Sequence, residues 1–305
     1  MLPKRGENVT KQRRAEWLLV LTTALWGTSY YLTDLCFAEL DPLNLNAIRF
    51  VTAFAVLGLI YRKHFRGMTR ETLRAGAAVG TALVFAYIGA TYGVKYTSLS
   101  NAGFISCLAG IITPVLELAV YRRRPEKKLV ITVLLCTLGL ALMTLGPDLR
   151  FASGDLICLL CSAAYSIDIL LTDRAVANEA VDPIGMSVVE IGFTGAAFTL
   201  LSLVFERPRL PRTPQVWAAA LFLGVFCSGV AFVLQTTQQK HSSATRVALI
   251  FTLEPVFSAL IAYFLAGERL HPRAYLGAVL MVLSVAWMQI DFKGGKIDDH
   301  IRESV

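Results

Sequence analysis

Ionisable side chains inside the long apolar stretches of this chain are candidates for function, because a charge is costly there. Among them are Arg49, Glu190 and Glu254. A carboxyl in such a place can carry a proton or face a cation, and a guanidinium can bind the carboxylate of a ligand or satisfy main-chain carbonyls. These residues predict ligand binding and proton exchange in an apolar medium, with Glu190 and Glu254 as the candidates for proton coupling.

Two stripes of aromatic and polar residues recur at helical spacing and predict the walls of one substrate cavity. Trp26 stands near the middle of its apolar stretch, away from the membrane interface where tryptophan is usually found. Steps of three or four residues place it on one helix face with Ser29, next to Tyr30. The second stripe lies 139 residues later and contains Tyr165 and Asp168. Helix packing through small polar residues is the alternative for both stripes. Exposure to water is a further alternative for Asp168, because it stands near the cytoplasmic end of its stretch.

Two more polar side chains and two prolines complete the candidate site. Gln235 can hydrogen-bond in the cavity or between helices, and Tyr87 can line the wall or pack in the core. Pro114 and Pro255 each stand within an apolar stretch and remove a main-chain donor, which permits a helix kink. Interrupted helices at matched positions in two halves are the best sequence pointer to a transporter's binding site. Helix geometry alone is the alternative interpretation of the Glu254–Pro255 pair.

The elements that must position these residues are membrane-spanning helices. Of the 305 residues, 55% are hydrophobic and only 17% are charged, whereas soluble domains carry about a quarter charged residues. Ten apolar stretches reach the length of a spanning helix, at residues 17–37, 43–61, 75–93, 102–121, 129–146, 153–172, 184–205, 215–237, 247–265 and 272–291. The predicted fold class is an all-α polytopic membrane protein with ten transmembrane helices.

The distribution of the basic residues predicts the orientation. The net charge is +7, but the Lys and Arg residues gather on one side of the predicted spans, 21 against 7, with Arg49 inside a span. Such an excess is typical of the cytoplasmic side. We therefore expect a multi-pass protein of the cell membrane whose tails, residues 1–16 and 292–305, are both cytoplasmic. The positions of the charges favour this reading over nucleic-acid binding.

The chain repeats itself with a spacing of 141 residues. Thr113-Pro114-Val115-Leu116 returns as Glu254-Pro255-Val256-Phe257, and Asp41-Pro42 returns as Asp182-Pro183. One repeat, residues 17–146, and the other, residues 153–291, each contain five predicted spans. Because five is odd, the second repeat must cross the membrane in the opposite sense. Inverted repeats of this kind are a device of secondary transporters.

The order of several short motifs resembles the drug/metabolite transporter superfamily, with two EamA-type domains. The motifs are Leu25-Trp26-Gly27, Ile48-Arg49-Phe50, Leu253-Glu254-Pro255 and Gly267-Glu268-Arg269. The first half departs from the pattern at residues 122–126, where the last of these motifs is blurred. The resemblance implies transport of a small molecule, with amino acids, other metabolites, nucleotide conjugates and drugs among the family's cargoes. Arg49 and Glu254 are habitual residues of the family, so a structural role is the alternative for both.

The function predicted is a secondary active transporter that exports a small organic metabolite such as an amino acid by alternating access, coupled to protons. The partners expected are the substrate and the lipid bilayer, with no cofactor, no metal and no nucleic acid. The chain contains no phosphate-binding glycine loop, no metal-ligand cluster and no nucleophile–base set, so an enzyme is not expected. The alternatives are a carrier for organic cations or drugs and, from another class, a receptor or assembly factor that transports nothing. The oligomeric state stays open, and a monomer fits the prediction.

Overall fold

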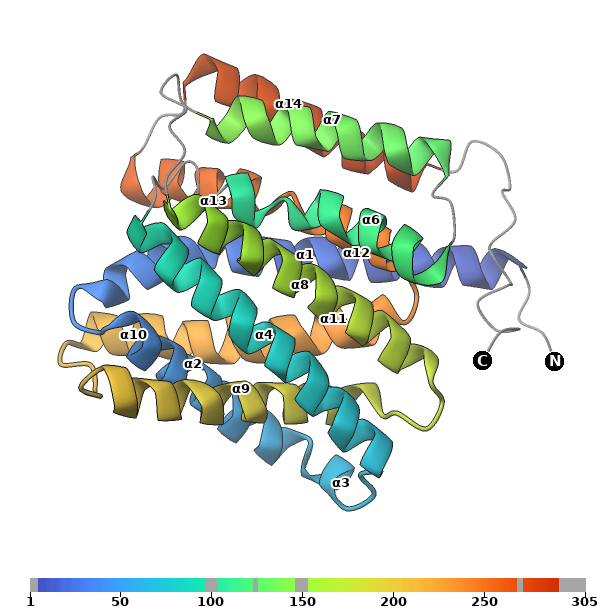
Figure 1. Cartoon of the computed structure of the whole chain (residues 1–305). Helices are drawn as coiled ribbons and strands as arrows, with labels where there is room; N and C mark the ends of the chain where they lie inside the picture. Colours follow the sequence, from blue (N-terminus) through green and yellow to red (C-terminus); the bar gives the residue numbers. More distant parts are fainter. Residues whose placement is uncertain (1–4, 97–103, 123–125, 146–152, 268–270, 291–305) are drawn as a thin grey trace.

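The computed structural model describes residues 5–96, 104–122, 126–145, 153–267 and 271–290, and in these residues every regular element is a helix. The chain order is shown in Figure 1. The elements are α1 (Arg5–Phe37), α2 (Pro42–Ile60), α3 (Arg62–Phe65), α4 (Arg70–Tyr96), α6 (Ala109–Tyr121), α7 (Lys127–Thr144), α8 (Ser153–Ala177), α9 (Pro183–Phe205), α10 (Pro214–Phe222), η1 (Leu223–Val230), α11 (Ala231–Gln239), α12 (Ala244–Phe251), α13 (Glu254–Ile261), η2 (Ala262–Ala266) and α14 (Pro272–Gln289).

Eight helical stretches in the described residues are long and apolar enough to cross a membrane. They are Pro42–Ile60, Arg70–Ala90, Phe104–Tyr121, Lys127–Thr144, Gly154–Ala177, Pro183–Phe205, Pro214–Gln239 and Ala244–Leu265. Their outward faces are apolar, since Leu59, Val204 and Phe264 are all more than 70% exposed. Patches of this kind suit contact with lipid. The protein is therefore a multi-pass membrane protein. α1 and α14, expected as the first and tenth spans, are not among the eight, so the count of ten stays a prediction.

The two Asp-Pro pairs begin helices but are held in different ways. The Asp182 carboxylate caps α9, because it accepts hydrogen bonds from the main-chain nitrogens of Ile184 and Gly185. No such cap forms at Asp41, which pairs instead with Arg209 at 3.3 Å. The free main-chain N–H groups of α2 are taken up by Glu206, whose two oxygens lie 3.0 and 2.7 Å from the nitrogens of residues 43 and 44. Each helix start thus has an acceptor for its orphan donors.

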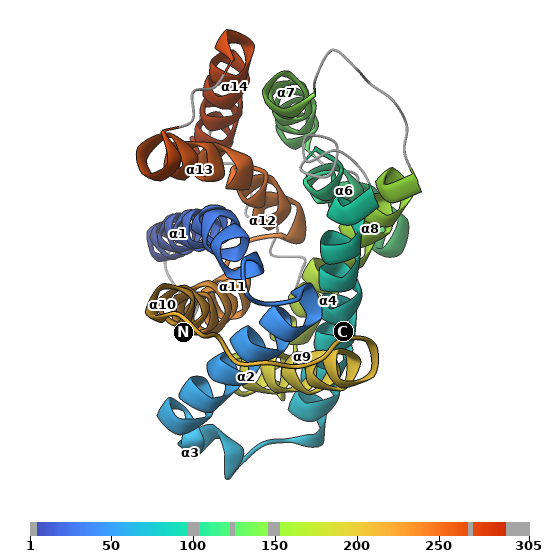
Figure 2. The ribbon, with the colours of Figure 1, turned by 90° about the vertical axis from the view of Figure 1, so that its left-hand side faces the viewer.

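The helices pack in pairs that correspond when the two halves of the chain are exchanged. α1 contacts α13 and α11, while α8 contacts α6 and α4. α2 contacts η1, and α9 contacts α4. Three further pairs, α2 with α9, α6 with α12 and α7 with α14, join equivalent helices of the two halves. Figure 2 shows α7 and α14 beside each other at one edge, with α11 and α12 nearer the middle and α1 and α8 on opposite sides of them.

Candidate functional site

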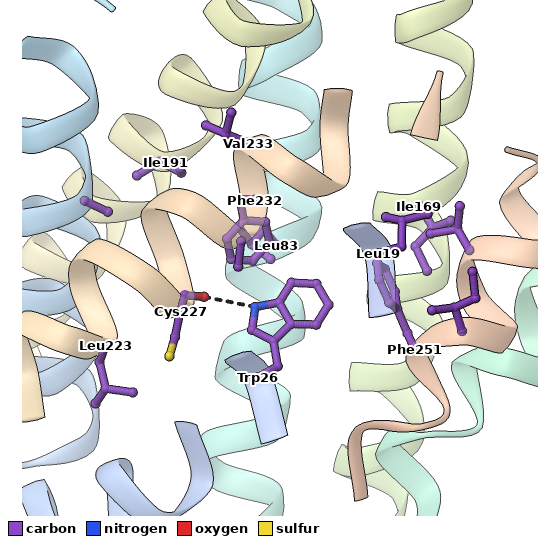
Figure 3. Close-up of a cluster of buried hydrophobic side chains, with 14 of the residues drawn as sticks. Leu19, Trp26, Leu83, Ile169, Ile191, Leu223, Cys227, Phe232, Val233 and Phe251 are labelled. Carbon is purple, nitrogen blue, oxygen red and sulfur yellow. Dashed lines mark hydrogen bonds between the residues drawn. The ribbon is translucent and has the colours of Figure 1, made fainter. Parts of the chain in front are cut away.

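Trp26 stands among aromatic rings contributed by three other helices. Its ring centroid is 4.8 Å from that of Phe251, 5.4 Å from that of Phe232 and 6.0 Å from that of Tyr165. The three partners belong to α12, α11 and α8, and Figure 3 shows Phe232 and Phe251 near the indole. Rings that meet edge to face at such distances attract one another. The two predicted stripes therefore meet at Trp26 and Tyr165, deep inside the protein.

A π-helical segment, η1, holds Trp26 in place. The indole N–H of Trp26 donates a hydrogen bond of 2.9 Å to the main-chain oxygen of Cys227 (Figure 3). Cys227 lies in η1, which separates α10 from α11. Segments in which main-chain bonds span five residues instead of four are rare, and they occur often at functional sites. The neighbouring Ser228 accepts a hydrogen bond of 2.8 Å from Nε of Arg49. One irregular segment thus anchors two of the predicted site residues.

Arg49 is buried on α2 with part of its hydrogen-bonding capacity unused. Its guanidinium carbon lies 5.2 Å from the ring centroid of Tyr87 and 5.6 Å from that of Phe50. Such distances allow cation–π attraction. The terminal nitrogen Nη2 has no hydrogen-bond partner among the described residues. A buried donor of this kind is costly when unpaired, so Arg49 is ready to bind an acceptor.

The span that contains Glu254 is interrupted beside Trp26 and Arg49. α12 ends at Phe251 and α13 begins at Glu254, with Pro255 in its first turn. The Glu254 carboxyl accepts a hydrogen bond from the hydroxyl of Tyr30 and is attracted by Arg49. No contact of ion-pair length joins Glu254 to Arg49 in the described residues. Tyr30 keeps 44% of its surface accessible. A guanidinium and a carboxyl therefore face the same region without a direct ion pair between them.

Gly27 lets α1 approach this interruption closely. A Cβ atom at position 27 would lie 2.5 Å from Cβ of Phe257 and 3.0 Å from the main-chain oxygen of Glu254. Those separations are too short for any side chain larger than hydrogen. The glycine of the Leu25-Trp26-Gly27 motif is thus required by the contact between α1 and α13.

A second polar cluster lies between α8, α9 and α11. Asp168 is fully buried, at 0% exposure, so the alternative of exposure to water is wrong for this residue. The side-chain nitrogen of Gln235 donates a hydrogen bond of 3.3 Å to Asp168. Glu190 is buried as well, and its carboxyl interacts electrostatically with that of Asp168. One oxygen of each of these three side chains has no hydrogen-bond partner among the described residues.

Other predicted residues contribute less than their spacing indicates. The Ser29 hydroxyl donates to the main-chain oxygen of Trp26, 2.7 Å away within the same helix, so that bond serves α1 itself. Tyr87 packs against Phe50, with 5.0 Å between the ring centroids. Pro114 stands inside α6, whereas Pro255 stands at the start of α13. The two prolines therefore occupy different places in their helices.

Sequence reasoning missed η1 and the aromatic partners of Trp26. A π-helical segment has no hydrophobic period of its own, and Cys227 and Ser228 look like small residues of an ordinary span. The signal in the sequence was the pair Gly224 and Gly229, which flank these two residues. Glycine permits close helix approach, and a Cβ at Gly224 would lie 2.8 Å from Cβ of Thr52. Close approach of α2 at that point is what brings Arg49 to Ser228.

One family model matches most of this chain, and similar proteins are named as transporters. The sequence model of the EamA-like transporter family matches residues 13–145 and 152–290. An uncharacterized transporter of Archaeoglobus fulgidus is 26% identical over 282 residues, which is 92% of this chain and 87% of that protein. The uncharacterized transporter YyaM of Bacillus subtilis is also 26% identical, over 85% of this chain and 88% of its own length.

A solved structure has the same fold. It aligns with this protein with a TM-score of 0.77 at 19% identity. The alignment covers 92% of this chain and 96% of the other. At that identity the likeness concerns the arrangement of the helices alone.

Proposed function

Because the chain belongs to the EamA-like transporter family, we propose that it is a secondary active carrier that exports a small organic metabolite, an amino acid in the leading case. It works in the cell membrane with both tails cytoplasmic, by alternating access. The corresponding helix pairs of the two halves support this proposal, since related halves can exchange their conformations around a central site. The interrupted span at Glu254 supports it too, because broken helices mark substrate sites in carriers.

The observation that indicates the substrate class is that Arg49 and Glu254 face the same region without forming an ion pair with each other. An amino acid carries a carboxylate and an ammonium group a few bonds apart. The carboxylate binds the unused Nη2 of Arg49, and the ammonium binds the Glu254 carboxyl, which already accepts from Tyr30. Each charge-assisted hydrogen bond contributes about 1.5–3 kcal/mol. The aromatic cluster around Trp26 supplies the apolar wall for the rest of the solute.

A carrier for organic cations is the second candidate. In these spans the buried carboxyls are those of Asp155, Asp168 and Glu190, with the half-buried Glu254 beside them, against the buried guanidinium of Arg49. The rings of Trp26 and Tyr165 also suit an ammonium group, because cation–π attraction selects quaternary amines. An organic cation does not need Nη2 of Arg49 for binding, whereas an amino acid does. Substitution of Arg49 therefore distinguishes the two candidates.

Binding to the purified protein tests the substrate class. We expect an amino acid to raise the melting temperature, and the matching amine, which lacks the carboxylate, to raise it much less. A ligand at about 100 times its dissociation constant adds about 2.7 kcal/mol of stability. Arg49→Lys should remove the response to the amino acid, and Glu254→Gln should weaken it, whereas Arg74→Lys on the exposed face of α4 should retain it. A larger response to quaternary amines than to amino acids, unchanged in Arg49→Lys, would support the cation carrier instead.

A further inference from the structure

We propose that Asp168 and Glu190 share one exchangeable proton and form the coupling-ion site of this carrier, apart from the substrate site at Arg49 and Glu254. The inference rests on the proposed transport function. It assigns Asp168, which the sequence grouped with the substrate residues, to the proton, and it assigns Glu254 to the substrate.

The first support is the charge balance of the cluster. Asp168 and Glu190 are both buried, and each lies on a helix that packs against α11. The group that acts on Asp168 is the amide of Gln235, and the charge that acts on Glu190 is that of Asp168. Two buried anions that act on each other in an apolar interior are strongly unfavourable without a cation. One proton relieves this repulsion and needs no space of its own.

The charged groups of the surrounding helices leave this balance unchanged. On α8, Asp155 is buried in the first turn, Asp173 is half-buried and Arg174 beside it is exposed. Asp182 is occupied as the cap of α9. On α4, the basic residues Arg70 and Arg74 are exposed near its start, and Tyr87 lies under the guanidinium of Arg49. The basic residue of α12, Arg246, pairs with Glu16 at 3.2 Å. α11 has no charged residue within its bounds.

The second support is a group of buried acceptors without donors, although the hydroxyls of Tyr165 and Thr172 on α8 are themselves unpartnered within the described part of the chain. Oδ1 of Asp168, Oε2 of Glu190 and Oε1 of Gln235 are all buried and have no partner among the described residues. All three atoms are acceptors, so none can satisfy another. A proton on either carboxyl creates an O–H donor for one of the remaining oxygens. The step is protonation of a carboxylate to a carboxylic acid, and its reversal returns the proton to water.

Two short routes connect this cluster to the substrate site. Asp168 lies about one turn after Tyr165 on α8, and the ring of Tyr165 meets that of Trp26 at 6.0 Å. Gln235 lies about one turn after Phe232 on α11, whose ring is 5.4 Å from Trp26. A change in the hydrogen bond between Gln235 and Asp168 therefore reaches Trp26 through rings that are in contact. This arrangement lets proton binding bias the helices that close around the substrate.

Infrared difference spectroscopy on the purified full-length protein tests the proton site without any substrate. Acid-minus-alkaline spectra of the wild type should contain a carboxylic-acid C=O band from a buried group. Because Glu254 is a further carboxyl in the interior, the spectra are compared in the Glu254→Gln background. There the double substitution Asp168→Asn/Glu190→Gln should remove the band, and Glu71→Gln, at an exposed carboxyl on α4, should keep it. A band that survives the double substitution would overturn the proposal, as would a band that sodium ions displace. Thermal unfolding of the single variants Asp168→Asn and Glu190→Gln checks that each protein is folded.

Transport by reconstituted protein completes the test. With a pH gradient across the liposome membrane, the wild type should accumulate solute. The double variant should exchange solute but accumulate none. Accumulation by the wild type that does not depend on pH would refute the coupling. A wild type that transports nothing while its infrared band is lost in the double variant would refute the proposed transport function and leave the proton site intact.

Discussion

The indole nitrogen of Trp26 on α1 lies 2.9 Å from the main-chain oxygen of Cys227 in η1. The bond joins the first half of the chain to an irregular segment of the second half. It fixes the orientation of a ring that touches three other helices. Tryptophan is suited to this place because it combines a large apolar body with a single donor.

Replacement of Trp26 by Phe should therefore destabilise the protein. The ring is kept in part, but the oxygen of Cys227 loses its donor in a buried position. An unsatisfied buried group costs about 1–3 kcal/mol, which chemical or thermal unfolding in detergent can measure. Trp17→Phe is the control, since Trp17 is 66% exposed. Equal effects of the two substitutions would contradict the importance of the bond.

Addition of a single methyl group at Gly27 should separate α1 from α13. The new Cβ would lie 2.5 Å from Cβ of Phe257 and 2.8 Å from the main-chain nitrogen of Ser258. Overpacking of this kind costs about 1–3 kcal/mol. Gly27→Ala should lower the melting temperature and weaken solute binding, because Glu254 lies at the same contact. At Gly67 nothing lies within 4 Å of an added Cβ, so Gly67→Ala should leave both properties unchanged.

The loop after α1 should make stability depend on pH in the acid range. The Glu39 carboxylate accepts hydrogen bonds from the main-chain nitrogens of Arg212 and Thr213, at 2.5 and 3.3 Å, which lowers the pKa of Glu39. A carboxyl whose pKa is lower in the folded state stabilises the protein above its unfolded pKa, near 4.3. That contribution is lost as the pH falls through the folded pKa.

A comparison of wild type and Glu39→Gln measures this effect. The wild type should melt at the higher temperature in neutral buffer, and the difference should shrink as the buffer is made more acid than the unfolded pKa. A difference that is constant across the pH range would show that the carboxylate charge has no part in it.

Much of the architecture could be predicted from the sequence because apolar length and internal repetition are local signals. The family follows from motifs such as Trp26-Gly27 and Glu254-Pro255. Eight stretches with the length and hydropathy of a span agree with predicted ones. α1 begins at Arg5, so its helical extent exceeds the predicted apolar stretch of residues 17–37.

The candidate site was harder to predict because tertiary contacts decide it. Spacing placed Trp26 and Tyr165 on matched faces, and the rings do meet. The spacing of the residues did not predict that Asp168 and Glu190 interact. α8 and α9 both pack against α4 and α11, and sequence spacing does not show such shared neighbours. Distance from a span end likewise suggested water at Asp168, whereas packing by neighbouring helices buries it.

The unequal helix starts at Asp41 and Asp182 bear on the resting state of the proposed carrier. Two identical halves would make the inward-open and outward-open forms equal in free energy, so that each would hold half of the molecules. Here one half caps α9 with its own Asp182, and the other borrows Glu206 from a distant loop to start α2. Inequalities of this kind tilt the equilibrium, and a difference of about 1.4 kcal/mol amounts to a tenfold preference for one form. The conformation that predominates in the empty carrier therefore depends on the contacts at the ends of its helices.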